Sequence, residues 1–118
     1  MNLDTLRKYC RTLPGATVDI KWGADECHCV GGKMFAVFGT RNKKATNVGF
    51  KCDPDRFLEL TDVAGIVPAP YLARAHWVLI QDPKALTDAQ AKDLVAHSHA
   101  LIMAKLTRKE RAAIASGQ

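Results

Sequence analysis

No long hydrophobic run occurs in this sequence of 118 residues. Its uninterrupted apolar stretches, such as Trp77 to Ile80, are only a few residues long, whereas a membrane-spanning helix needs about 20 apolar residues. The first residues carry an acid at Asp4 and lack the apolar segment of a secretory signal. These absences predict a cytoplasmic protein with no membrane partner.

Compositional extremes are absent as well. Hydrophobic residues make up 47% of the chain and charged residues 25%, which is close to the average for soluble globular domains. A disordered tail, a collagen-like rod and a low-complexity linker are therefore excluded. The length is that of one domain, and the sequence contains neither repeats nor a linker. We expect a single, monomeric domain over residues 1–111 and a frayed tail over residues 112–118.

Cysteine is present, but without the spacing of a disulfide framework or of a zinc site. The four cysteines are Cys10, Cys27, Cys29 and Cys52. Cys27 and Cys29 are separated by one residue, which is a poor spacing for mutual bridging, and structural zinc sites use more widely spaced pairs. In a reducing cytosol we expect four free thiols, no structural metal and no cofactor.

Three segments show helical periodicity behind a residue suited to helix capping. They cover residues 3–12, 54–60 and 88–106, and their caps are Asn2, Asp53 and Thr87. The expected strands lie between turn residues and cover residues 17–22, 26–30, 33–39, 46–51 and 74–80. Residues 63–71, which are rich in proline, are expected to form a loop.

This order of elements predicts an α+β fold. Strands that follow one another along the chain, with helices gathered at its ends, indicate an antiparallel sheet. We expect about five strands, covered on one face by the N- and C-terminal helices. Leu101 and Ile102 of the last helix are expected to pack on this face, against Val18, Ile20, Phe35 and Val37 or their neighbours. Val18 and Ile20 alternate with polar residues and share a side with Trp22.

Positive charge gathers in one part of the sequence. The chain carries 17 basic and 12 acidic residues, a formal net charge of +5. Arg41, Lys43 and Lys44 form the expected tip of a hairpin, and Lys33 and Lys51 lie on its strands. A basic hairpin can place cations along phosphates without reading bases, which makes these five residues candidates for weak, sequence-independent DNA binding. The alternative is a solvated turn, because lysine and arginine are common at exposed tips.

Four blocks of the sequence resemble the MmcQ/YjbR family. They are Gly31-Gly-Lys-Met-Phe-Ala36, Phe50-Lys-Cys-Asp-Pro54, Gly65-Ile-Val-Pro-Ala-Pro-Tyr71 and Arg74-Ala-His-Trp-Val78. The blocks come in the family's order, and the end of the last helix, Lys105-Leu-Thr-Arg-Lys109, is also similar. The resemblance runs from residue 1 to about residue 111.

The resemblance implies a frataxin-like (CyaY-like) fold and a role in DNA binding, sometimes through a proposed double wing. It does not imply the iron chemistry of frataxin, because function follows side chains rather than topology. Iron would require an acidic ridge along the first helix, since hard cations prefer carboxylate oxygens. That helix sets Asp4 against Arg7, Lys8 and Arg11, so its charge disfavours iron delivery.

A second group of residues suggests a pocket that would bind a small anionic ligand. If residues 74–80 form a strand, Arg74 and His76 point to one face of it and Trp77 to the other. Arginine would supply a planar fork for the anion. The alternative places Trp77 in the core and leaves His76 bonded to backbone. The candidate pocket residues are Trp22, Lys33, Tyr71, Arg74 and His76.

Catalysis finds little support in the sequence. No phosphate-binding loop, dinucleotide-binding glycine pattern or zinc-protease motif occurs. Cys27 and Cys29 are possible nucleophiles, but a buried strand thiol is usually inert. We therefore expect a protein without enzymatic activity. Two hypotheses stay open: a DNA-binding module that uses the basic hairpin and the basic C-terminal segment, and a domain that binds a small anionic ligand or another protein.

Overall fold

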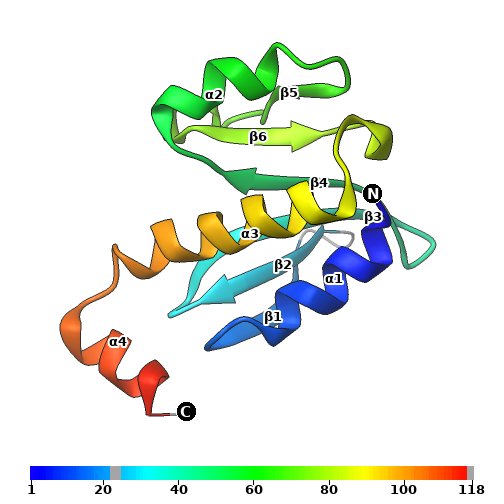
Figure 1. Ribbon diagram of the computed structural model, residues 1–118. Coiled ribbons are helices and arrows are strands. Elements are labelled where there is room, and N and C mark those ends of the chain that lie inside the picture. The colour runs from blue at the N-terminus through cyan, green and yellow to red at the C-terminus, as the bar shows by residue number, and fades with distance from the viewer. Residues whose placement is uncertain (22–24, 117–118) are drawn as a thin grey trace.

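A six-stranded antiparallel sheet with helices packed on one face organises the chain (Figure 1). The computed structural model describes residues 1–21 and 25–116. Its helices are α1 (Leu3–Thr12), α2 (Pro54–Thr61), α3 (Asp88–Met103) and α4 (Arg108–Ala115), with short 3₁₀ turns η1 (Ala73–Ala75) and η2 (Pro83–Ala85). Its strands are β1 (Ala16–Lys21), β2 (Asp25–Val30), β3 (Lys33–Arg41), β4 (Lys44–Lys51), β5 (Ile66–Pro68) and β6 (Trp77–Ile80), in the order β1-β2-β3-β4-β6-β5. The predicted α+β class is confirmed, with six strands where about five were expected.

Local sequence explains how the first elements begin and turn. The side chain of Asn2 accepts a hydrogen bond from a first-turn amide and caps α1. Gly31 and Gly32, with φ of 57° and 78°, connect β2 to β3 in a left-handed conformation that glycine adopts without strain. Asn42 and Lys43 connect β3 to β4 with φ of 53° and 66°, the pattern of a type I′ hairpin turn.

Helices α1 and α3 lie on the same face of the sheet, as predicted (Figure 1). Phe35 and Phe38 of β3 and Phe50 of β4 are fully buried beneath them. Ser98 of α3 joins the two strands where their pairing stops. Its hydroxyl donates to the carbonyl of Phe35 at 2.6 Å and accepts from the amide of Lys51 at 3.0 Å.

Strand β5 corrects the prediction of a loop over residues 63–71. Ile66–Pro68 pairs antiparallel with β6, and Ile66 is buried opposite Ile80. β5 lies at the edge of the sheet and ends at Pro68, where the missing amide of proline removes no interior hydrogen bond. A proline-rich segment can therefore supply an edge strand.

The last strand begins later than predicted. Residues 73–75 form η1, and His76 lies in the left-handed region with φ of 62°, so β6 starts at Trp77. The predicted alternation of Arg74 and His76 with Trp77 across a strand is therefore wrong, because two of the three residues lie outside it. Trp77 itself is only 5% exposed.

Strand β1 contributes less to the core than predicted. Val18 is 39% exposed and Ile20 is 59% exposed. Ile20 is the register partner of Glu26, and the carboxylate of Glu26 forms ion pairs with Arg7 and Arg11 of α1. Charged groups thus occupy the space between α1 and this edge of the sheet, and they leave no apolar surface for Ile20 to pack on.

The C-terminal segment differs from the prediction in two ways. Leu101 is only half-buried, whereas Ile102, which was also expected in the core, lies there with Ala91, Leu94 and Val95 of α3. Residues 112–115, expected to fray, continue helix α4. Thr107 caps α4 in a reciprocal capping box with Glu110, and Ile114 packs against the core. No helix among the described residues is long and apolar enough to cross a membrane.

Candidate functional site

Three of the predicted DNA-binding residues lie together at the β3–β4 turn, called here the hairpin tip. Arg41 and Lys44 are register partners, and Lys43 lies in the turn between them. All three residues are exposed. No ion pair among residues 1–21 and 25–116 involves them. The hairpin tip therefore presents three uncompensated positive charges to solvent.

Helix α1 holds the hairpin tip through a buried carboxylate. Nε and Nη2 of Arg7 each donate to one oxygen of Glu26 at 2.9 Å, and Glu26 is only 3% exposed. Nη1 of Arg7 donates to the carbonyl of Lys43 at 3.4 Å. A bidentate arginine–carboxylate pair fixes the orientation of the guanidinium, so this contact positions the turn against α1.

Glu26 also contacts two further groups. Nη2 of Arg11 lies 3.4 Å from Glu26, and Nε2 of the fully buried His28 lies 2.9 Å from it. The bond from Arg7 lowers the pKa of Glu26 to about 2, and burial lowers the pKa of His28. Nδ1 of His28 has no hydrogen-bond partner among the described residues. A neutral His28 that donates through Nε2 accounts for this arrangement.

Lys33 and Lys51, the other two candidates for DNA binding, lie at the opposite end of the sheet. β3 runs from Lys33 to Arg41, so about 27 Å separates these two residues along the strand. Lys51 ends β4, and its ammonium group donates to the carbonyl of Ala75. Burial and the nearby Lys105 lower the pKa of Lys51. The five cations thus form two groups rather than one continuous stripe.

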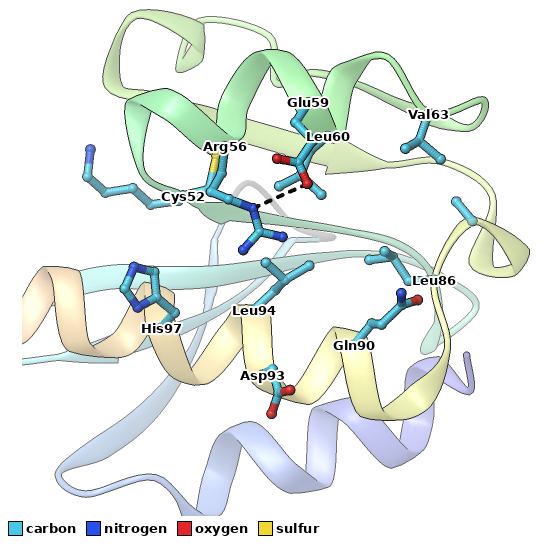
Figure 2. A pocket seen from close by; sticks show the side chains of 12 residues that line it. Cys52, Arg56, Glu59, Leu60, Val63, Leu86, Gln90, Asp93, Leu94 and His97 are labelled. Atoms are coloured by element: carbon cyan, nitrogen blue, oxygen red, sulfur yellow. Dashed lines mark ion pairs between the residues drawn. The ribbon is translucent and has the colours of Figure 1, made fainter.

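A cleft of about 450 Å³ lies between α2 and α3 (Figure 2). Its floor belongs to the core and includes Leu60, Leu86 and Leu94. The remaining lining is mainly polar and contributes Lys51, Arg56, Glu59, Gln90, Asp93 and His97. An apolar floor beneath ionisable groups of both signs suits a small ligand with a charged end.

Arg56 retains hydrogen-bonding capacity in this cleft. Its Nε lies 3.7 Å from the carboxylate of Glu59, and its two terminal nitrogens have no hydrogen-bond partner among the described residues. Figure 2 shows the guanidinium of Arg56 pointing from α2 across the cleft toward Leu94 of α3. Its planar fork matches the geometry of a carboxylate or a phosphate.

A polar contact joins α2 and α3 at one end of the cleft. Nε2 of His97 lies 2.7 Å from Oδ2 of Asp53. Asp53 occupies the predicted cap position of α2, but its side chain makes no capping hydrogen bond and pairs with His97 instead. This contact links the two walls of the cleft through residues that are 44 positions apart in the sequence.

The described residues of the predicted anion pocket do not lie together in the structure. Trp22 lies outside the described residues. Tyr71 is fully exposed and lines a groove on the face of the sheet opposite α1 and α3. The ring of His76 packs edge-on against Phe57 of α2, with ring centroids 5.7 Å apart. Arg74 is exposed in η1 and lines neither the groove nor the cleft between α2 and α3.

The thiols are unfavourable nucleophiles. All four are buried and unbridged. Burial raises the pKa of Cys10 to about 12 and also raises the pKa values of Cys27, Cys29 and Cys52. Cys52 lines the cleft with His97, but its Sγ donates to the carbonyl of His76. Among residues 1–21 and 25–116, no three His, Cys, Asp or Glu side chains gather as a metal site would require.

Sequence reasoning missed Arg56 and His97 as site residues. One signal was available for Arg56, which is the single cation of a helix otherwise rich in carboxylates. His97 offered none, because its role depends on α2 and α3 lying side by side. The same holds for Glu26, whose importance comes from the approach of Arg7 across the helix–sheet interface.

Residues 11–101 match the sequence pattern of the YjbR family. The chain belongs to the YjbR family. The matched range includes all six strands in full together with α2 and most of α3, so membership rests on the whole sheet region. The resemblance seen in the four sequence blocks is therefore confirmed. No curated protein matches the chain.

Two solved structures share the fold. Deinococcus radiodurans protein DR2400, with a DUF419 domain, is 24% identical with a TM-score of 0.83, over 97% of this chain and 88% of that one. A Pseudomonas syringae protein, a target of the Northeast Structural Genomics Consortium, is 20% identical with a TM-score of 0.67, over 86% of this chain and 98% of that one. At these identities the likeness to both structures concerns the fold alone.

Proposed function

We propose that this member of the YjbR family is a monomeric, non-enzymatic protein that binds DNA through the hairpin tip. The observation that carries the proposal is the group of three exposed cations, Arg41, Lys43 and Lys44, which no carboxylate of the described residues neutralises. Phosphate oxygens would supply the missing negative charge. Contacts of this kind follow the backbone of the nucleic acid and carry no sequence information.

The helices support non-specific rather than base-specific binding. A recognition helix needs a free polar or basic face to enter the major groove. α2 instead carries carboxylates, among them Asp55 and Glu59, which phosphates would repel. α3 packs its buried face on the sheet, and α1 uses Arg7 to hold Glu26. None of these three helices offers such a face, and the exposed Arg108 and Lys109 of α4 are a second source of phosphate contacts beside the hairpin tip.

Binding to duplex DNA at several salt concentrations tests the proposal. With about three phosphates contacted, the logarithm of the affinity should fall with the logarithm of salt at a slope near −3. Replacing Arg41, Lys43 and Lys44 together by Ala should weaken binding to all sequences alike and flatten that slope. A control variant with Arg56, Lys84 and Lys92 replaced by Ala has the same net charge and should bind like the parent. Equal loss in the two variants would contradict the proposal.

A second candidate function is the binding of a small anion in the cleft between α2 and α3. The unused terminal nitrogens of Arg56 favour it, together with the apolar floor at Leu60 and Leu94. Titration with hexanoate, followed by NMR shifts of backbone amides, should perturb α2 and α3 in the parent and not in Arg56→Gln. The hairpin-tip variant should retain hexanoate binding, and Arg56→Gln should retain DNA binding. The two functions are thereby separable.

The absence of catalysis has its own support. Burial keeps the four thiols in their protonated form at neutral pH, and the Sγ of Cys52 donates to a carbonyl rather than facing a base. His97 is engaged with Asp53, which leaves it as an orienting contact between two helices. The parent protein should therefore hydrolyse a panel of phosphate and carboxylate esters no faster than a His97→Gln variant does.

A further inference from the structure

The face of the sheet opposite α1 and α3 carries a groove of about 680 Å³. Phe38 and Phe50 point toward the helices, so their neighbours Val37 and Gly49 point away from them. Val37, Gly49 and Leu79 are register partners across β3, β4 and β6 and form the floor. The volume falls in the range of small-molecule sites, which is roughly 300–1,000 Å³.

The missing side chain at Gly49 opens this floor. Gly49 lies in the interior of β4 and is absent from the positions with positive φ, so its backbone conformation does not require glycine. A Cβ built there would meet its nearest neighbour, the carbonyl oxygen of Val78, at 3.4 Å. Glycine inside a strand weakens the strand, and it often marks a place where a ligand approaches closely.

Tyr71 stands at the rim of the groove in a strained conformation. The amide of Leu72 donates to the carbonyl of Ala69 at 3.2 Å and closes a turn with Pro70 second and Tyr71 third. Tyr71 has φ of 66°, a value that turns normally assign to glycine at this position. Tyr71 is 104% exposed, so no packing against other described residues offsets the strain. A strained and exposed aromatic residue beside a cavity is typical of a binding site.

The polar lining of the groove is confined to one end and carries one charge. Asp25 is the charged residue of the lining, and Asn47 lies on the other side of Gly39, which is the register partner of both residues. No ion pair within the described residues involves Asp25, although Lys21 is its cross-strand partner on β1. The other end holds Trp77, roughly 15 Å away along the strands.

We propose that this groove binds a small aromatic amine in its cationic form. The flat ring would lie over Gly49, between Trp77 and the rim at Tyr71, and the ammonium group would approach Asp25. Aromatic rings pack favourably against one another, and the carboxylate supplies the charge opposite to the ammonium at the polar end. The proposal is independent of the hairpin tip and of the cleft between α2 and α3.

Two naphthalene probes of opposite charge test the proposal on the full chain. We expect 2-naphthylmethylammonium to bind about fivefold more tightly than 2-naphthoate, as followed by amide NMR shifts at Val37, Gly49 and Leu79. Asp25→Asn should remove this preference. Asp55→Asn removes an exposed carboxylate on α2 and should leave the preference unchanged.

Variants of the floor and the rim locate the bound probe. Gly49→Val places a branched side chain on the floor and should lower the affinity for 2-naphthylmethylammonium by about tenfold. Tyr71→Gly should lower this affinity by about threefold. The melting temperature of the Tyr71→Gly variant should stay equal to that of the parent or rise, because the strain at positive φ is relieved. This second variant keeps the test valid if Gly49→Val fails to fold.

Three outcomes would overturn the proposal. The first is that neither probe binds, or that both bind equally. The second is that Gly49→Val and Tyr71→Gly bind the cation as tightly as the parent. The third is that the shifts map to α2 and α3, which would place the probe in the other cavity.

Discussion

The two faces of the sheet come from the same strands and are filled in opposite ways. On the face beneath α1 and α3, Phe38 and Phe50 are fully buried, whereas on the other face their neighbours Val37 and Gly49 border an open groove. The strands alternate their side chains, so one stretch of sequence supplies both faces. The comparison suggests that stability comes from one face and leaves the other free to bind.

The two faces also differ in whether their polar side chains have partners within the described residues. On the helix-covered face, the carboxylate of Glu26 and the hydroxyl of Ser98 each have two or more hydrogen-bond partners. On the open face, Asp25 forms no ion pair with any described residue. Most buried polar groups on the helix-covered face are satisfied by other described residues, with Nδ1 of His28 as the exception, whereas a polar group at a binding surface is free to bond a ligand.

Substitutions on the two faces should differ most in their effect on the free energy of unfolding when a buried aromatic residue is truncated. Phe50→Ala removes a fully buried ring and should destabilise the protein by about 3–5 kcal/mol. Val37→Ala, on the neighbouring strand but facing the groove, should cost about 1 kcal/mol. Urea unfolding of both variants measures the difference. Equal losses would show that the open face is also part of the core.

Acid should weaken the helix-covered face through Glu26. The pKa of its carboxyl is about 2 in the folded protein and 4.5 as an ordinary value, so its contribution is present above pH 4.5 and is lost as the pH falls toward 2. The full contribution is about 3 kcal/mol. The depressed pKa of His28 acts in the same direction, with loss of stability below pH 6.5.

Unfolding by urea between pH 7 and pH 2.5 measures this effect. Glu26→Gln should be less stable than the parent at pH 7, because Arg7 loses its buried charged partner and keeps only the exposed Asp4 among the described residues. The variant should also show a flatter pH dependence below pH 4.5. An unchanged slope in the variant would assign the acid sensitivity to other carboxylates.

Removal of the Ser98 hydroxyl should have a smaller effect on the same face. Ser98→Ala leaves the amide of Lys51 and the carbonyl of Phe35 without a partner, which should cost about 1–3 kcal/mol. Ser116→Ala removes an exposed hydroxyl and serves as the control, with a change of less than about 0.5 kcal/mol. Faster hydrogen exchange at Lys51 in the first variant would identify the site of the loss.

The smallest effect is expected on the open face. Gly49→Ala adds a Cβ whose nearest contact is at 3.4 Å, so the free energy of unfolding should change by less than about 0.5 kcal/mol in either direction. Thermal melting of the variant measures it. A loss of several kcal/mol would show that the floor of the groove is closely packed, and would remove the contrast between the two faces.

Much of the fold was predictable because local chemistry determined it. Asn2 and Thr87 cap their helices, and Gly31 and Gly32 connect two strands, each as the sequence indicated. The errors arose where a neighbour overrode a local pattern. Ile20 alternates like a core residue but is exposed, because Glu26 and its arginine partners occupy the space beside it.

The candidate sites were predictable to a smaller extent. Arg41, Lys43 and Lys44 could be placed on one turn because they are close in sequence. Lys33 and Lys51 could not be assigned to the opposite end of the sheet without knowing the hairpin register. Tyr71 and Arg74 were grouped by sequence, and the turn at residues 73–76 separates them.

The sequence by itself determined the α+β class, the family, most element boundaries and the positive charge of the hairpin tip, since each depends on residues within a few positions of one another. Only the tertiary structure decided that Arg56 and His97 share a cleft and that Gly49 opens a groove between Trp77 and Asp25. Both arrangements join segments far apart in the chain. Their geometry is set by the packing of helices on strands and by strand register, which no local pattern of residues encodes.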